Sequence, residues 1–579
     1  MSYELQDKVV LITGGSHGIG AKVIEFLLEE NVKYIANLDI AKDVGISQEA
    51  KYSQKYGNKL KFYQCDVTNE EQLLGAYDSV LKEQGYIDVV INSAGIMNDS
   101  KEKYRKEIEI NFTALTTSTL KALEIMRKDE GGRGGVVLNI SSIAALIQDE
   151  LLPVYYGTKS AVLQFSNCIG MPRYYARTGV RIVTMCFGAT DTALLHKDML
   201  GNFDKEIHDN MMEAVKQHPL QTVESAASSL VEVLKRGESG STWLSIANKP
   251  VKDITPDVKK AYGILSELVF ETISYIIRPP VSSTSLRCCD ARKGGGGKRE
   301  RGCFLSPLPQ KTHWAPKGSR IPATVERGLW THIANLDVAE KAGVAQQDEL
   351  NKKYGTNILK FYKCDVSNEE QLMGAYQTIL DEQGSIDIVI NNAGIANDSK
   401  EKYKKEIDIN FLAATTSTLK AIEIMRKDEG GNGGVVLNIS SAAALCQDEL
   451  LPIYAATKSA ILQFSNCIGM PKYYSRTGVR VVTLCYGGTE SHIFRDFDTI
   501  DKTFVNHFNE VIVKVFPPQK VESAASALVE VLKNGESGST WMSANNKPVQ
   551  DITPTIKKAY GIMSEAYTNF YADSFEKVS

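Results

Sequence analysis

The sequence predicts an α/β protein whose parallel sheet is doubly wound and present in two tandem copies. Short Val/Ile-rich runs alternate with amphipathic helical stretches, which is typical of a parallel sheet covered by helices on both faces. A glycine-rich turn follows the first of these runs. The second half of the 579 residues also repeats the first half at an offset of 298 or 299 positions.

The expected strands of the first copy are runs of four to eight residues, too short for typical helices. An amphipathic stretch follows each of them, beginning with residues 21–30 after the glycine turn. The runs are residues 9–13, 34–38, 60–65, 89–92, 135–140 and 180–186.

The second copy begins later in the repeat than the first. The pentapeptide IANLD stands at residues 35–39 and again at 333–337, but the preceding residues 313–332 contain nothing like VVLITGGSHGIG at 9–20. In a doubly wound sheet of order 3-2-1-4-5-6 the first strand is central. Its loss predicts that the second copy splits its sheet and has no pyrophosphate site.

These observations divide the chain into three parts. Residues 1–277 form a complete domain and residues 327–579 an N-terminally truncated second one. Residues 278–326 contain four consecutive glycines, a basic cluster and no periodicity, which predicts a disordered linker. A nuclear-import or anion-binding role for the basic residues 298–301 is the alternative. The arrangement suggests two neighbouring tandem genes joined in a conceptual transcript, with the linker translated from non-coding sequence and the first exon of the second copy omitted. A genuine fusion with an inactive second domain is the alternative.

Composition narrows the class of protein. The net charge of -4 argues against nucleic acid or an anionic membrane as the main partner. The ten cysteines include no CxxC pair, so neither a metal site nor a disulfide framework is predicted, and a cytoplasmic location fits best. No apolar run approaches the ~18 residues of a membrane span, and the N-terminus lacks signal-peptide features.

The glycine turn TGGSHGIG has the features of a Rossmann-type dinucleotide site. Gly14, Gly18 and Gly20 would allow a tight turn and the close approach of a pyrophosphate to a helix N-terminus. Asp39 ends the next strand, where an acid can bind a ribose 2′-hydroxyl and repel a 2′-phosphate. This favours NAD over NADP; the alternative is that Asp39 only forms a turn at the strand end.

A second set of residues has the spacing of a catalytic group. Tyr155 and Lys159 are four apart and therefore share one helix face. Ser142 precedes Tyr155 by thirteen residues, at the end of an apolar strand, and Asn111 lies thirty-one residues before Ser142. The second copy repeats this set at the same spacing as Asn410, Ser441, Tyr454 and Lys458.

Together these motifs resemble the classical short-chain dehydrogenases/reductases. The resemblance also includes CDV at 65–67, NSAG at 92–95 and CFGATDT at 186–192, and it covers residues 7–275 and, truncated, the chain from 331 onward. Residues 215–243 are similar to the branch that holds insect-type alcohol dehydrogenases and NAD-dependent hydroxyprostaglandin dehydrogenase-like proteins.

The resemblance implies a role for each polar residue. Tyr155 would be the base, and a Lys159 ammonium about 4 Å away would lower its pKa from ~10 by roughly three units. Ser142 would bind the substrate oxygen, Lys159 the nicotinamide ribose, and Asn111 a water that passes the proton out. Asp66 would contact the adenine and Asn92 the adenosine ribose side of the cofactor. Thr190 and Thr192 would contact the nicotinamide carboxamide. The full cofactor set is Gly14, Ser16, Gly18, Ile19, Gly20, Asp39, Asp66, Val67, Asn92, Ala94, Gly95, Tyr155, Lys159, Gly188, Thr190 and Thr192.

The sequence therefore predicts an NAD-dependent oxidoreductase that interconverts a secondary alcohol and its ketone through the first copy. The copies differ most at residues 191–219 and 490–518, the expected substrate lid, whose apolar residues predict an apolar or lipid-like substrate. A non-catalytic carrier or storage protein with the same fold is the alternative. The resemblance also implies a homodimer or an internal pseudo-dimer, because the helices through which the family pairs are nearly identical in both copies.

Overall fold

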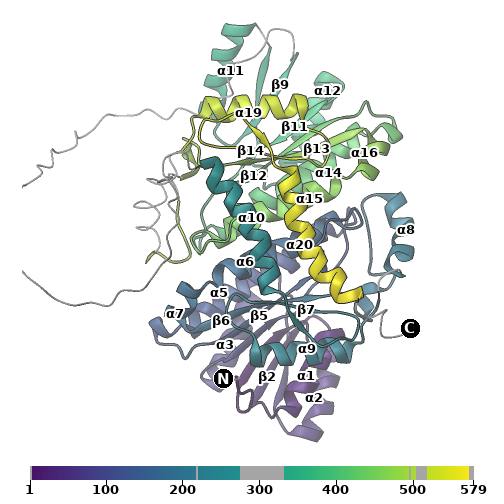
Figure 1. Cartoon of the computed structure of the whole chain (residues 1–579), viewed down its shortest axis with the longest axis vertical. Coiled ribbons are helices and arrows are strands. Elements are labelled where there is room, and N and C mark those ends of the chain that lie inside the picture. The colour runs from purple at the N-terminus through teal and green to yellow at the C-terminus, as the bar shows by residue number, and fades with distance from the viewer. Residues whose placement is uncertain are drawn as a thin grey trace, which may run out of the picture.

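The computed structural model describes residues 3–216, 219–273, 331–355, 357–494, 497–503 and 518–572. The predicted linker 278–326 and most of the second copy's predicted lid lie outside these residues. Figure 1 shows the two copies of the fold, one above the other. Within the described part of the chain, no helix is both long and apolar enough to cross a bilayer.

The first copy contains one eight-stranded sheet of order β3-β2-β1-β4-β5-β6-β7-β8, so the predicted doubly wound order is confirmed. All neighbouring strands are parallel except β8, which pairs with β7 in the antiparallel sense. The sequence analysis missed these last two strands. The strands are β1 (Val9–Thr13), β2 (Tyr34–Asp39), β3 (Leu60–Gln64), β4 (Val89–Asn92), β5 (Gly135–Ser142), β6 (Val180–Phe187), β7 (Thr242–Ser245) and β8 (Lys252–Asp253).

Helices cover both faces of this sheet, and their ends follow local sequence signals. Asn69 caps one helix by accepting a bond from the Gln72 backbone, and Gly85 ends it in the left-handed region. Pro153 stands in the first turn of another, where its missing N–H has no partner to lose. The helices are α1 (Gly18–Glu29), α2 (Lys42–Tyr56), α3 (Glu70–Gln84), α4 (Tyr104–Ile108), α5 (Leu115–Met126), α6 (Pro153–Ile169), α7 (Pro172–Thr178), α8 (Lys205–Lys216), α9 (Val223–Arg236) and α10 (Thr255–Ile273).

The second copy is split, as its missing first strand predicts. Strands β9 and β10 form a two-stranded sheet, and β11 to β15 form a separate five-stranded sheet. Ile91 in β4 is fully buried against β1, whereas its counterpart Ile390 in β11 is 39% exposed. The strands are β9 (Ile333–Asp337), β10 (Leu359–Lys363), β11 (Ile388–Asn391), β12 (Gly434–Ser441), β13 (Val479–Tyr486), β14 (Thr540–Ser543) and β15 (Gln550–Asp551).

The remaining helices of the second copy match those of the first. A short π-helical segment, Asp408–Ala413, joins two of them, as Glu109–Ala114 does in the first copy. The helices are α11 (Glu340–Tyr354), α12 (Glu369–Gln383), α13 (Tyr403–Ile407), α14 (Ala414–Met425), α15 (Pro452–Ile468), α16 (Pro471–Thr477), α19 (Val521–Asn534) and α20 (Thr553–Ala572).

The two copies contact each other through equivalent helices. Helix α6 packs on α15, and α10 packs on α20 between the two sheets (Figure 1). The Ser160 and Ser459 hydroxyls lie 3.1 Å apart at the centre of the first pair. Tyr104 bonds Thr416 and Tyr403 bonds Thr117, so the polar contacts repeat in both directions, which is the pattern of a two-fold axis.

We expect the missing strand to make β9 exchange its amide hydrogens faster than β2. Residues 35–39 and 333–337 have the same sequence, but β2 pairs on both sides while β9 pairs with β10 among the described strands. Exchange followed by mass spectrometry should show at least about tenfold greater protection of residues 35–39, or about 1.4 kcal/mol of opening free energy. Equal protection of the identical segments would contradict the split sheet.

Candidate active site

The glycine turn packs between two segments that the sequence analysis assigned to a cofactor. Gly14 has a φ of +71°, and a Cβ there would lie 2.8 Å from the Ala94 Cα. Gly18 has a φ of +52°, and its Cβ would lie 3.2 Å from Thr192 Cγ2. Side chains at these positions would therefore fill the space beside the start of α1, where a pyrophosphate can meet a helix N-terminus.

Asp39 holds the end of β2 against this turn. Its carboxylate accepts bonds from the backbone N–H groups of Ser16 and Ala41, both at 2.9 Å. Asp39 therefore forms a turn, as the alternative reading expected, and also lies against the glycine loop. Because a carboxylate offers about four acceptor positions, these two bonds leave capacity for a ribose hydroxyl.

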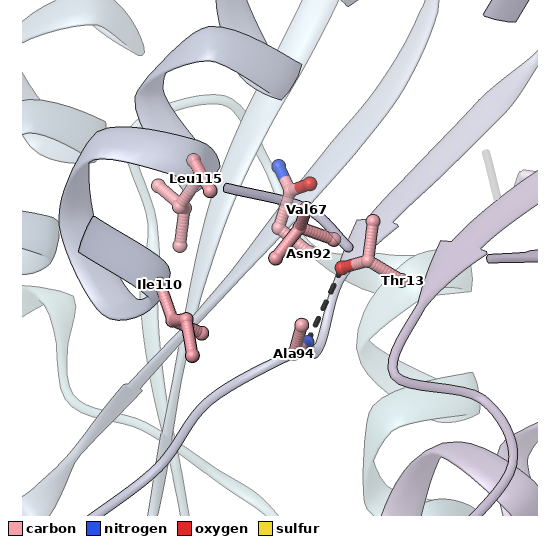
Figure 2. Close-up of a pocket in the computed structure, with 7 residues that line it drawn as sticks. Thr13, Val67, Asn92, Ala94, Ile110 and Leu115 are labelled. Carbon is pink, nitrogen blue, oxygen red and sulfur yellow. Dashed lines mark hydrogen bonds between the residues drawn. The ribbon is translucent and has the colours of Figure 1, made fainter. Parts of the chain in front are cut away.

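A small cavity of about 10 Å³ opens between the ends of β1 and β4, and Figure 2 shows the residues around it. Val67, Asn92 and Ala94 of the predicted cofactor set line it. The Thr13 hydroxyl accepts bonds from the Ser93 and Ala94 backbones at 3.1 and 3.2 Å and so fixes this loop. Thr13 was not predicted, although it is the threonine that opens the glycine motif.

Two of the predicted cofactor residues, Asn92 and Asp66, have their side chains engaged within the protein. Asn92 donates to Asn139 at 2.8 Å and accepts from Ser118 at 2.6 Å, which points its amide into the interior of the domain. The Asp66 carboxylate pairs with Lys106 at 3.2 Å at the rim of the site. A cofactor would therefore meet the backbone of Asn92 rather than its amide.

The four predicted catalytic residues come together at one end of the sheet. Tyr155 and Lys159 lie on α6, Ser142 ends β5, and Asn111 lies in the π-helical segment Glu109–Ala114; all four are buried. The Lys159 Nζ lies 5.5 Å from the centre of the Tyr155 ring.

The loop after β4 joins this group to the cofactor side. A Cβ at Gly95 would lie 3.2 Å from Asn111 Oδ1 and 3.7 Å from Lys159 Nζ. The Asn111 amide bonds the Ile96 backbone in both directions, donating to its carbonyl at 2.8 Å and accepting from its N–H at 2.9 Å. Asn111 is therefore the tie between the π-helical segment and the loop that carries Ala94 and Gly95.

The expected effect of Lys159 on Tyr155 is wrong for this structure. Burial raises the pKa of Tyr155 well above its usual value, and only the hydrogen bond from Ser142 opposes this rise. Burial also lowers the pKa of Lys159 to about 8, against the opposing charge of Glu107. The Lys159 ammonium donates to the Ile140 carbonyl at 3.2 Å, and removal from water is the largest cause of the pKa shift of each group.

Comparison with known proteins gives the family. The profile described as short chain dehydrogenase matches residues 8–201 and 324–500, which together exceed half of the chain. The chain belongs to the short-chain dehydrogenase family. The match to both segments of the sequence agrees with the two copies of the fold.

Individual relatives cover one copy of this chain. Alcohol dehydrogenase 1 of Ceratitis capitata is 33% identical over 253 residues, which are 42% of this chain and 92% of that protein. The NAD(+)-type 15-hydroxyprostaglandin dehydrogenase of Macaca fascicularis is 29% identical over 233 residues, 39% of this chain and 86% of that protein. Among solved structures, the NADPH-dependent 3-quinuclidinone reductase from Rhodotorula rubra is 24% identical, covers 42% of this chain and 92% of its own, and has a TM-score of 0.36.

A buried carboxyl pair supports helix α6, which carries Tyr155 and Lys159. Asp99 accepts bonds from the Val154 and Tyr155 backbones at 2.6 and 3.0 Å, at the start of α6. Burial raises the pKa of both Asp99 and Glu107, and the charge of Asp99 raises that of Glu107 further, so the pair is expected to keep a proton to higher pH than separate carboxyl groups do. The sequence analysis missed this pair because the residues form no known motif.

The second copy of the dehydrogenase fold repeats the catalytic geometry without the glycine turn. Lys458 lies 5.7 Å from the Tyr454 ring and donates to the Ile439 carbonyl at 3.2 Å. Asn410 bonds the Ile395 backbone as Asn111 bonds Ile96. The described part of this copy begins only two residues before β9. These described residues therefore include no equivalent of the glycine turn around Gly14.

Glu107→Gln should reduce the loss of stability between pH 4.5 and 7. The raised pKa values mean that the folded chain keeps a proton that the unfolded chain releases, so wild-type stability falls as the pH rises through this range. A glutamine can accept from Asn98 and donate to Asp99 without a titrating proton. In thermal unfolding experiments, the free energy of unfolding of the variant relative to wild type should rise by about 1–3 kcal/mol from pH 4.5 to pH 7.

The control for this experiment is Glu102→Gln, which removes an exposed carboxylate on the preceding loop. Its stability at both pH values gives the baseline for removing one exposed carboxylate outside the buried pair. A Glu107→Gln difference that is the same at both pH values would show that the pair holds no shared proton.

Proposed function

We propose that the first copy is an NAD-dependent oxidoreductase that interconverts a secondary alcohol and its ketone. The observation that supports the proposal is the joint approach of Gly18 to Thr192 and of Gly95 to Asn111 and Lys159, from which we infer a dinucleotide cradle beside the predicted catalytic group. Relatives named alcohol dehydrogenase and NAD(+)-type 15-hydroxyprostaglandin dehydrogenase support the reaction class and the cofactor. The carboxylate of Asp39 would repel a 2′-phosphate, which favours NAD over NADP.

In this proposal Tyr155 takes the proton from the alcohol oxygen during oxidation and gives a proton to the ketone oxygen during reduction. NAD supplies the acceptor for the hydride that leaves the alcohol carbon. Ser142 donates a hydrogen bond to the substrate oxygen, and Lys159 holds the nicotinamide ribose. Because burial keeps the Tyr155 phenol protonated, the same group can return a proton to a ketone oxygen when the reaction runs as a reduction.

The surroundings of Tyr155 favour an apolar substrate. Met97, Leu200 and Met211 pack into the same cluster as Tyr155, and the lid residues Leu194 and Leu195 border it. An apolar or lipid-like alcohol would bury its chain there. The alternative is a non-catalytic carrier that binds such a ligand; the buried Ser142, Tyr155 and Lys159 favour an enzyme, and NADH formation with a panel of secondary alcohols distinguishes the two.

The second copy, residues 327–579, is proposed as an inactive partner of the catalytic domain, residues 1–277, with residues 278–326 as the linker. Its helices α15 and α20 occupy the positions that a second subunit would take in a homodimer, so the chain would act as an internal pseudo-dimer. Among the described residues of this copy, no dinucleotide cradle accompanies Tyr454 and Lys458. A cytoplasmic location is part of the same proposal.

Tyr155→Phe should lower turnover by about 10²- to 10⁴-fold because it removes the group that exchanges the proton. The affinity for NAD should stay within about twofold, since the hydroxyl lies outside the glycine cradle. Steady-state kinetics and calorimetric titration with NAD measure the two effects. Tyr454→Phe is the matched control and should leave turnover unchanged; near-wild-type turnover of Tyr155→Phe would refute the mechanism.

Asp39→Ala should weaken the binding of NAD and reduce the preference of the enzyme for NAD over NADP. The substitution removes a charged acceptor for the ribose and the repulsion of a 2′-phosphate, so the ratio of kcat/KM values should fall by about tenfold or more. Asp337→Ala makes the same change in the second copy and should alter neither cofactor. An unchanged ratio in Asp39→Ala would show that Asp39 acts only as a turn former.

A further inference from the structure

The segment that leads into the substrate-covering helix α8 of the first copy rests on the second copy. Asp204 accepts bonds from the Glu206 and Ile207 backbones at 3.1 and 3.3 Å and so caps the start of α8. Its other oxygen pairs with Arg476 at 2.7 Å and with Arg426 at 3.2 Å. Both arginines belong to the second copy, and Asp204 is 1% exposed, so its charge depends on them.

Neighbouring contacts extend this attachment. The Phe203 ring stacks on Tyr473 of the second copy, with ring centres 5.8 Å apart and an angle of 13° between the planes. Arg476 also pairs with Glu206, in the first turn of α8, at 3.2 Å. The start of α8 is thus held on the second copy by a ring stack and by two arginines.

The same segment is bonded to the catalytic helix of the first copy. The Asp99 backbone donates to the Gly201 carbonyl at 2.9 Å, and the Asp99 carboxyl receives the Tyr155 N–H at 3.0 Å. The Asn202 amide donates to the Leu151 carbonyl at 2.5 Å, just before α6. Farther along α8, Met211 packs into the cluster that contains Tyr155.

We propose that Arg426, Arg476 and Tyr473 of the second copy are positioning residues that hold α8 over Tyr155 of the first copy. This inference rests on the proposed function for the identity of the site that α8 covers. In this role the second copy needs neither a first strand nor a cofactor. Its contacts with α8 determine how tightly α8 covers the substrate site of the first copy.

We call the pairing of Asp204 with Arg426 and Arg476 the clamp. The second copy makes the equivalent contacts with the first. Asp501 of the second copy is 5% exposed and pairs with Arg177 at 3.1 Å and with Arg127 at 3.4 Å, both from the first copy. It also accepts a bond from the Thr503 backbone at 3.1 Å, as Asp204 does from Glu206. This second clamp lies on the copy without a glycine turn, so it is a matched control for contacts between the copies.

The test compares Asp204→Asn with Asp501→Asn. Asparagine keeps the oxygen that caps the helix and loses the charge that the arginines bind. Asp204→Asn should raise the alcohol KM about tenfold or more, with kcat and the NAD KM within about twofold. It should also speed amide exchange in residues 205–211 of the cofactor-free protein. Asp501→Asn should change none of these values.

Variants of an arginine provide the rescue. Arg476→Gln should reproduce the effects of Asp204→Asn, the double variant should be no worse than either single one, and Arg476→Lys should recover most of the wild-type KM. Equal effects of Asp204→Asn and Asp501→Asn on KM, or a fall in kcat alone, would overturn the inference. If wild type forms no NADH with any alcohol, the proposed function fails. Amide hydrogen exchange in α8 still tests whether the second copy holds this helix. Faster exchange in Asp204→Asn alone supports the inference, and unchanged exchange overturns it.

Discussion

The central position of β1 is the constraint on which the first copy depends. This strand pairs with β2 on one side and β4 on the other, so it holds the glycine turn against the loops that follow both neighbours. Its last residue, Thr13, receives the backbone N–H groups of Ser93 and Ala94, and Asp39 receives that of Ser16. The second copy shows the consequence of losing the strand, because β9 and β11 then belong to separate sheets.

Around this strand, buried polar side chains fix the loops that carry the chemistry. Asn111 ties the π-helical segment to Ile96, and the Asp99–Glu107 pair ties the same region to the backbone of Tyr155. Since a buried polar group that loses its partner is destabilising by about 1–3 kcal/mol, each tie is strongly favoured over its alternatives. The catalytic group is therefore ordered by a polar network as well as by apolar packing.

The sequence predicts the parts of this structure that depend on period and spacing. The first six strands, their order, the split sheet and the convergence of Ser142, Tyr155 and Lys159 follow from apolar runs and motif distances. The raised pKa values of Asp99 and Glu107 could not be predicted, because they depend on burial that is set by residues distant in sequence. The pKa of Tyr155 was misjudged for the same reason: spacing places a lysine nearby but does not show that its ammonium is turned toward the Ile140 carbonyl.

Three of the four residues that correspond to the predicted catalytic set in the second copy make hydrogen bonds within the fold. The Asn410 amide holds the loop at Ile395, and the Ser441 hydroxyl accepts a bond from the Ala443 backbone at the end of β12. Helix α15, which carries Tyr454 and Lys458, packs along α6 of the first copy. Loss of the Asn410 or Ser441 side chain would leave buried backbone groups without hydrogen bonds. Folding and pairing thus favour the retention of these residues in the second copy independently of any reaction there.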